Sequence, residues 1–182
     1  MDRYADGDDA AFSELYDHVA PRLYAYLVRQ TRDRSRTEDL VQQALLCIHR
    51  GRGTFIRGAQ VLPWAFGIAR RLLIDSIRHE RRSPTLVHEE DPGTTTRASS
   101  EATPEEILHG QDIARRLARE LGRLPEAQRV AFELLKQDGL SLSEAAQVLG
   151  TSVTAVKLRA HRAYVALRSA LGDEVAAAGG AS

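Results

Sequence analysis

The residues best suited to chemistry lie in the last third of the sequence, where two helical patterns meet at Gly150. Ser141 and Glu144 have the spacing of a capping box, in which each side chain bonds to the backbone of the other residue, and this predicts a helix start. Gly150 can adopt the left-handed conformation that ends a helix, and Ser152 can cap the next helix. Two short helices joined by a tight glycine turn form a helix-turn-helix, whose second helix normally enters DNA.

The second helix of this motif is predicted to have a basic face. No acidic residue occurs between residues 145 and 172, a stretch that contains Lys157 and three arginines. Contact with phosphates and reading of the major groove both need such a face. An ordinary amphipathic helix with a solvated charged side is the alternative. The residues expected to face DNA are Ser152, Thr154, Lys157, Leu158, Arg159, His161 and Arg162. The stripe expected to be buried is Val153, Val156, Ala160, Ala163 and Leu167.

A tryptophan beside several arginines marks a second candidate site, on a helix predicted from Pro63 to Arg82. One face of this helix is apolar, and the other shows Trp64, Arg71, Asp75, Arg78 and Arg82, with Arg70 at its edge. An aromatic ring among arginines can stack on bases and hold the backbone of single-stranded DNA. Alternatively, Trp64 fills the core and the arginines are only a solvated face. This helix alone does not decide between the two interpretations.

A polar patch lies on an earlier helix, which is predicted to begin at Thr37 and to end at Arg50. The patch consists of Glu38, Asp39, Gln42 and Gln43. Acidic residues in the first turn of a helix suit its macrodipole. The patch is therefore either a solvated helix start or an interaction surface.

The composition excludes several classes of function. The single cysteine, Cys47, rules out an internal disulfide and a multi-cysteine metal site, and it is expected to be a small core residue. The six histidines show no metal-ligand spacing, and no phosphate-binding glycine loop or serine-nucleophile motif is present. We therefore expect no catalytic residue, no metal and no cofactor. The acidic N-terminus lacks the apolar run of a signal peptide, and nothing has the length of a membrane span, which predicts a cytoplasmic protein.

The periodicity predicts an all-α fold of two small helical domains joined by a flexible linker. The first domain covers residues 8–82, with its first helical piece bent or ended at Pro21. Residues 83–104 form an acidic linker rich in Ser, Thr, Pro and Gly, and residues 105–172 form the helix-turn-helix domain. The 25 basic and 25 acidic residues balance, but they are unevenly distributed. Residues 1–20 contain six acids against Arg3, whereas residues 51–82 contain seven arginines. This alternation favours a polyanion-binding middle and end.

Three blocks of the sequence resemble the extracytoplasmic-function (ECF) group of bacterial RNA polymerase sigma factors, in the sigma-70 family. Residues 38–49 are similar to the family's Asp-Leu-Val-Gln helix. Residues 64–78 are similar to its helix Trp-x-x-x-Ile-Ala-Arg-x-x-Leu-Ile-Asp-x-x-Arg. Leu124-Pro125 with residues 143–163 resemble its C-terminal DNA-binding domain. The likeness covers about residues 8–172 in the family's order, and the three blocks together are specific.

The resemblance implies a protein that directs core RNA polymerase to specific promoters. The patch of Glu38, Asp39, Gln42 and Gln43 would dock on the clamp helices of the largest polymerase subunit. The second domain would read the −35 element, and the linker would thread through the polymerase. The loop from Gly53 to Leu62 and the helix after it would capture the opened −10 strand. The residues implied in that capture are Phe55, Arg57, Trp64, Arg70, Arg71, Asp75 and Arg78.

The family also implies an anti-sigma factor that holds such a protein inactive until a stress signal. Residues 41–46 with 63–65 are similar to a subgroup controlled by membrane-embedded anti-sigma factors. Two positions depart from the family pattern. Arg71 stands where asparagine is usual, and Leu158 replaces a polar groove-facing residue, from which position it can meet a thymine methyl group.

A simple transcription regulator is the first alternative, because many regulators carry a similar C-terminal helix-turn-helix. It would leave the tryptophan–arginine helix and the acidic linker unexplained. An enzyme lacks a motif here, and a pure protein-interaction module has no need of a basic recognition face.

Overall fold

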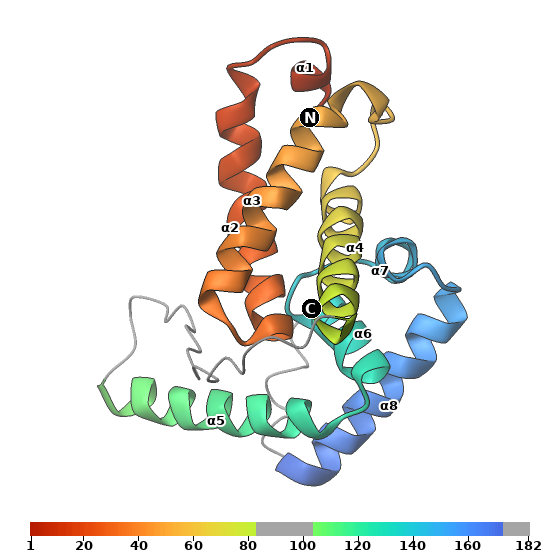
Figure 1. Ribbon diagram of the computed structural model, residues 1–182. Helices are drawn as coiled ribbons and strands as arrows, with labels where there is room; N and C mark the ends of the chain where they lie inside the picture. Colours follow the sequence, from red (N-terminus) through yellow and green to blue (C-terminus); the bar gives the residue numbers. More distant parts are fainter. Residues whose placement is uncertain (83–103, 173–182) are drawn as a thin grey trace. The chain divides into compact units, whose positions relative to one another are not determined.

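The computed structural model describes residues 1–82 and 104–172, and within these ranges every regular element is a helix (Figure 1). This confirms the all-α prediction. The chain divides into two compact units. The first contains the helices before residue 83, and the second contains α5, α6, α8 and most of α7. Residues 83–103 of the expected linker lie outside the described residues, and Pro104 is already the first residue of a helix.

The N-terminal unit is built on three long helices that pack side by side (Figure 1). They are α2 (Ala11–Thr31), α3 (Arg34–Arg50) and α4 (Val61–Arg82). A short α1 (Asp2–Ala5) precedes them, and a 3-10 turn, Arg52–Thr54, lies between α3 and α4. The buried side chains of the three helices include Leu15, Val19, Leu23, Tyr26, Leu27, Leu40, Ala44, Ile48, Ala65, Phe66, Ala69 and Leu73. Tyr26 and Phe66 meet edge to face at 5.2 Å in this core.

The sequence predicts that Pro21 either bends or ends the first helical piece. Pro21 does not end it, because α2 continues through this residue to Thr31. A proline inside a helix removes one backbone hydrogen bond. Pro21 itself is exposed, while Val19, Ala20 and Leu23 on either side of it are buried. Packing of the apolar face against α3 and α4 therefore outweighs the local loss.

The predicted helix start at Thr37 is also wrong, because α3 begins one turn earlier. Asp33 is the N-cap, and its carboxylate accepts a hydrogen bond from the Arg36 N–H at 3.0 Å. The Thr37 side chain is fully buried, and its hydroxyl donates to the Asp33 carbonyl oxygen at 2.6 Å. Glu38 therefore lies beyond the first turn, which contains no acidic residue.

A polar clasp joins α3 to the second half of α4. The Arg36 guanidinium forms an ion pair with Glu80 at 2.9 Å and donates to the Ser76 hydroxyl at 3.2 Å. The Arg36 side chain is only 23% exposed, so these contacts are partly shielded from water. They fix the distance between the two helices at a point away from the apolar core.

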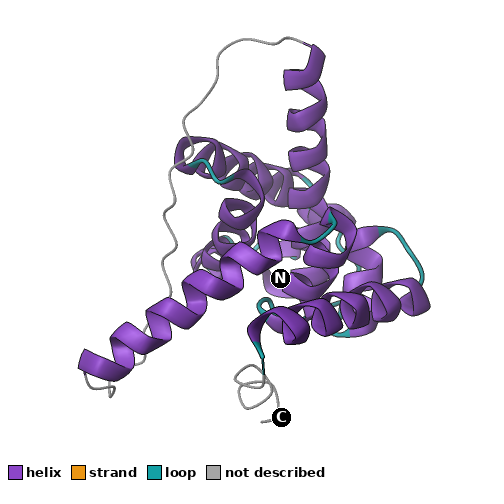
Figure 2. Cartoon of the chain, turned by 90° about the horizontal axis from the view of Figure 1, so that it is seen from below, coloured by secondary structure: helices purple, strands orange, loops and turns teal. Residues whose placement is uncertain are grey.

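The C-terminal unit consists of α5 (Pro104–Arg123), α6 (Glu126–Lys136), α7 (Leu142–Leu149) and α8 (Val153–Leu171). Figure 2 shows the chain, helical in both units, from a second direction. Helix α8 packs against α6 and α5. The buried side chains between these helices include Leu121, Val130, Leu134, Val156, Ala163 and Leu167. Leu124 and Pro125 separate α5 from α6, as the sequence predicts.

Candidate nucleic-acid interface

The starts of α7 and α8 are set by two caps and a glycine turn. The Ser141 N–H donates to the Glu144 carboxylate at 2.7 Å, and the Glu144 N–H donates to the Ser141 hydroxyl at 3.3 Å. Gly150 has φ +60°, and the following Thr151 N–H donates to the Ala146 carbonyl oxygen at 3.1 Å. The Ser152 hydroxyl then accepts from the Ala155 N–H at 3.1 Å. The predicted capping box, glycine turn and N-cap are confirmed.

The exposed face of α8 is basic and carries most of the predicted groove-facing set. Ser152, Thr154, Lys157, Leu158, His161 and Arg162 are exposed, and Arg159 is half-buried. Within the expected buried stripe, Val156, Ala163 and Leu167 are buried and Ala160 is half-buried. Val153 was expected in that stripe but is 46% exposed, because it occupies the first position of the helix. Leu158 is 47% exposed, so an apolar side chain stands among the cations.

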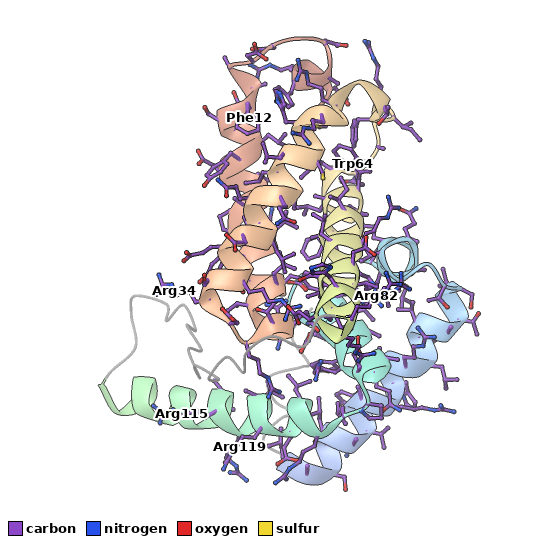
Figure 3. The ribbon with its side chains drawn as sticks, in the orientation of Figure 1. Phe12, Arg34, Trp64, Arg82, Arg115 and Arg119 are labelled. Carbon is purple, nitrogen blue, oxygen red and sulfur yellow. The ribbon has the colours of Figure 1, made fainter. Side chains whose placement is uncertain are left out.

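Helix α4 separates an apolar face from a basic one. Pro63, Ala65, Phe66, Ala69 and Leu73 are buried. Of the predicted strand-binding residues on this helix, Arg71, Asp75 and Arg78 are exposed, and Arg70 and Trp64 are half-buried. Arg78 lies 3.7 Å from the Asp75 carboxylate, and both side chains are largely exposed. Figure 3 shows Trp64 near the beginning of α4 and Arg82 at its end. The arginines of the basic face lie in the later part of the helix, from Arg70 to Arg82.

Trp64 is neither fully in the core nor free. Its ring meets Phe55 at 5.1 Å with an interplanar angle of 63°, and a Cβ added to Gly51 would lie 3.4 Å from the indole. Phe55 is only 7% exposed, so its ring presents little surface to a strand. The two rings therefore form one unit, in which Phe55 supports Trp64 and only Trp64 has surface left for stacking.

The loop between α3 and α4 is held by the N-terminal segment. Arg57 forms an ion pair with Asp6, and the Gly58 N–H donates to the Asp2 carboxylate at 3.2 and 3.3 Å. Ile56, at the tip of the same loop, is 76% exposed. Sequence reasoning missed α1 and these contacts. The available signal was the charge contrast between the acidic first twenty residues and the arginine-rich region around the loop.

The polar patch on α3 is open to solvent. Glu38, Asp39, Gln42 and Gln43 are all exposed, while the neighbouring Leu40 and Ala44 are buried. Glu38 pairs with Arg34 at 3.2 Å. Leu46, 48% exposed, lies one turn further along the helix. The patch is thus a polar surface with an apolar residue at one end, and the rigid helix core fixes its shape.

Among residues 1–82 and 104–172, no cluster of three or more His, Cys, Asp or Glu side chains has the arrangement of a metal site. Cys47, expected in the core, is half-buried. In the same ranges, no helix has both the length and the apolar character needed to span a membrane.

Comparison with known families identifies both units. The family model described as Sigma-70 region 2 matches residues 15–83, and the model described as Sigma-70, region 4 matches residues 114–167. The RNA polymerase sigma factor CarQ of Myxococcus xanthus is 36% identical over 173 residues, which cover 95% of this chain and 96% of that protein. The ECF RNA polymerase sigma factor SigF of Caulobacter vibrioides is 35% identical over 178 residues, covering 92% and 89% of the two chains.

Two solved structures share the fold. The sigma factor RpoE of Bartonella quintana, crystallised with the anti-sigma factor NepR, superposes with a TM-score of 0.70 at 23% identity and covers 90% of this chain and 98% of its own. CnrH, in complex with the cytosolic domain of CnrY, superposes with a TM-score of 0.66 at 24% identity and covers 93% of each chain.

Proposed function

The chain belongs to the sigma-70 family of RNA polymerase sigma factors, in its ECF group, and we propose that its two units recognise the −10 and −35 elements of bacterial promoters. Its function is to direct core RNA polymerase to promoters, so it is a transcription initiation factor and not an enzyme. One observation carries the proposal. In each unit, one helix (α4 in the first, α8 in the second) packs its apolar face in the core and presents an exposed face with cations.

The −35 element is assigned to α8. Its exposed cations suit contacts with phosphates, which fix position on the duplex, and its exposed polar and apolar side chains suit contacts with base edges. Leu158 in this position fits the methyl group of a thymine. The Ser152 hydroxyl caps the N-terminus of α8 by accepting from the Ala155 N–H, and helix N-termini favour anionic groups such as phosphates.

The −10 strand is assigned to the basic face of α4 and the loop before it. Trp64 supplies a ring for stacking, and Arg71 and Arg78 supply charge for the backbone. The half-buried position of Trp64 supports this assignment, because a ring held by its contact with Phe55 loses little freedom when a base stacks on its remaining surface.

The polar patch on α3 is assigned to the clamp helices of the largest polymerase subunit. Docking there holds both DNA-binding units near the promoter, so that each raises the effective concentration of the other without any new contact. A promoter-specificity subunit of this kind binds DNA weakly alone and well as part of the polymerase.

An anti-sigma factor is the expected regulator. Of the two structural neighbours, RpoE was crystallised with the anti-sigma factor NepR, and CnrH was solved in complex with the cytosolic domain of CnrY. By analogy, we assign to this chain a partner that covers its polymerase-binding surface until a stress signal arrives, and the site of action is the bacterial cytoplasm.

Run-off transcription with purified core polymerase tests the function, on promoter fragments enriched from the protein's own genome. Specific transcripts that appear only with the protein are expected. Lys157→Glu and Arg162→Glu should each lower them about tenfold or more while polymerase binding stays intact. Arg168→Glu is the matched control, because it makes the same charge change on α8 outside the predicted groove-facing set.

Asp39→Arg tests the second surface and should have the opposite profile, losing polymerase binding first. If Lys157→Glu abolishes polymerase binding, the assignment of α8 to DNA is wrong. If the protein binds duplex DNA tightly alone and never co-purifies with polymerase, the simple-regulator interpretation replaces this one.

A further inference from the structure

The loop assigned to the −10 strand already has anionic ligands, and they come from the protein's own N-terminus. Arg57 is paired with Asp6, and the Gly58 N–H is bonded to Asp2 at 3.2 and 3.3 Å. These contacts join residues more than fifty positions apart in the sequence. The two acids lie in the acidic first segment, residues 1–20, ahead of the family-like blocks of the sequence.

The two donors have the chemistry of a phosphate site. A guanidinium offers a fork of N–H groups with full positive charge, and phosphate oxygens accept such groups readily. The Gly58 N–H donates to the Asp2 carboxylate from a turn in which φ is +73°, and backbone N–H groups in such turns bind anions. In this structure, carboxylates of Asp6 and Asp2 accept from both donors.

We propose that the Arg57–Gly58 turn is a phosphate-binding site for the opened promoter strand, and that Asp2 and Asp6 occupy it in the free protein as competing carboxylates. This proposal rests on the proposed function, because it assigns a ligand to the loop that faces the −10 strand. It adds a specific contact and an internal competitor for that contact.

Aromatic packing holds the competing acids in place, so their position does not depend on the ion pair. Tyr4, in the middle of α1, is 2% exposed, and its hydroxyl is bonded to the His49 ring. Its ring lies 5.2 Å from that of Phe12, and the Arg52 guanidinium lies 5.4 Å above it. The anchored turn of helix therefore presents Asp2 on one side of Tyr4 and Asp6 on the other. Removing either carboxylate should leave α1 docked.

The strength of the competition follows from exposure. The Arg57 side chain is 75% exposed and that of Asp6 is 46% exposed, so their ion pair is a surface pair. Surface pairs are weak, and a DNA backbone that brings several phosphates at once displaces them. The acids therefore reduce binding by a small factor and do not block it.

The test is a double-mutant cycle on the full chain, with a short fluorescein-labelled oligothymidylate as the probe and anisotropy at low salt as the measurement. Asp6→Asn should tighten binding about two- to fivefold. Asp9→Asn is the matched control. Asp9 is an exposed acid of the same segment, and its substitution removes the same charge at a position that does not pair with the loop. It should have a smaller effect.

The second arm repeats both substitutions in an Arg57→Ala background, where the advantage of Asp6→Asn over Asp9→Asn should disappear. Equal effects of the two substitutions in the native background overturn the proposal, and so does a difference that survives Arg57→Ala. Absence of probe binding by every variant also overturns it. Run-off transcription with the native chain separates the outcomes: if transcription is promoter-specific and the cycle fails, only this proposal is wrong, whereas loss of transcription refutes the function itself.

Discussion

Replacing either ring of the Trp64–Phe55 pair with leucine separates structural support from contact with DNA. Both Trp64→Leu and Phe55→Leu remove the same ring–ring contact, which has a centroid distance of 5.1 Å. Such pairs contribute about 0.5–1.5 kcal/mol beyond the area they bury. Each substitution also loses some apolar contact, so we expect a destabilisation of about 1–2 kcal/mol in either case. For a unit of this size, this corresponds to a fall in melting temperature of about 5–15 °C.

The two variants should differ in promoter opening. Trp64 is half-buried, and Phe55 is 7% exposed. Stacking of a base on an aromatic side chain contributes about 1–3 kcal/mol, so Trp64→Leu should reduce open complex formation by about tenfold or more. Phe55→Leu should reduce opening less, by about threefold, because it removes the support that restrains Trp64 but no contact with DNA.

Permanganate reactivity of unpaired thymines measures opening, at a temperature at which calorimetry shows both variants to be folded. As Trp64 is the only tryptophan, its fluorescence in the isolated chain also reports on stacking when an oligonucleotide is added. Equal losses of opening in the two variants, or destabilisation by Trp64→Leu without any loss of opening, would refute the stacking interpretation and make Trp64 a core residue.

Three other outcomes are expected. Ser152→Ala removes the cap on α8 and should lower the unfolding free energy of the C-terminal unit by about 1 kcal/mol, as measured by thermal melts. Thr154→Ala is the control, because it removes a hydroxyl from the same turn without removing the cap. If Arg162 contacts a phosphate, Arg162→Gln should reduce the magnitude of the slope of log affinity against log salt concentration by about 0.9 for the holoenzyme on its promoter. An unchanged slope with altered base preference would instead make Arg162 a base contact. The hydrogen bond from Arg3 holds the pKa of Asp8 below its usual 3.8, so the stability it contributes is present above that value and is lost as pH falls through the lower folded pKa. Melting temperatures of Asp8→Asn should therefore fall less steeply below about pH 4 than those of the native protein, and parallel curves would contradict the pairing.

Local signals that involve only neighbouring residues were predictable from the sequence. The capping box of Ser141 and Glu144, the glycine turn and the Ser152 cap depend on short spacings, and the structure confirms each of them. The two-unit helical architecture followed from periodicity in the same way.

Features that depend on tertiary packing were missed. Thr37 has the residue type of a cap but lies buried in the core, and the real cap, Asp33, is followed by polar residues that carry no apolar period. Pro21 is tolerated within α2 because the core holds the helix on both sides of it. The burial of Phe55 follows from its contact with Trp64, which no pattern of spacing in the loop predicts.

The contacts of Arg36 with α4 connect the polar patch on α3 to the basic face of α4. Asp39, in the polar patch, lies three residues from Arg36, which is about 4.5 Å along the helix axis. Arg36 in turn holds Ser76 and Glu80 on α4. A partner bound to the patch is therefore connected, through a single turn of α3 and the Arg36 contacts, to α4, which carries the basic face. The accuracy with which the partner binds the patch therefore determines how accurately the basic face is positioned. A weakened contact between Arg36 and α4 would then appear as transcription from a wider range of start sites.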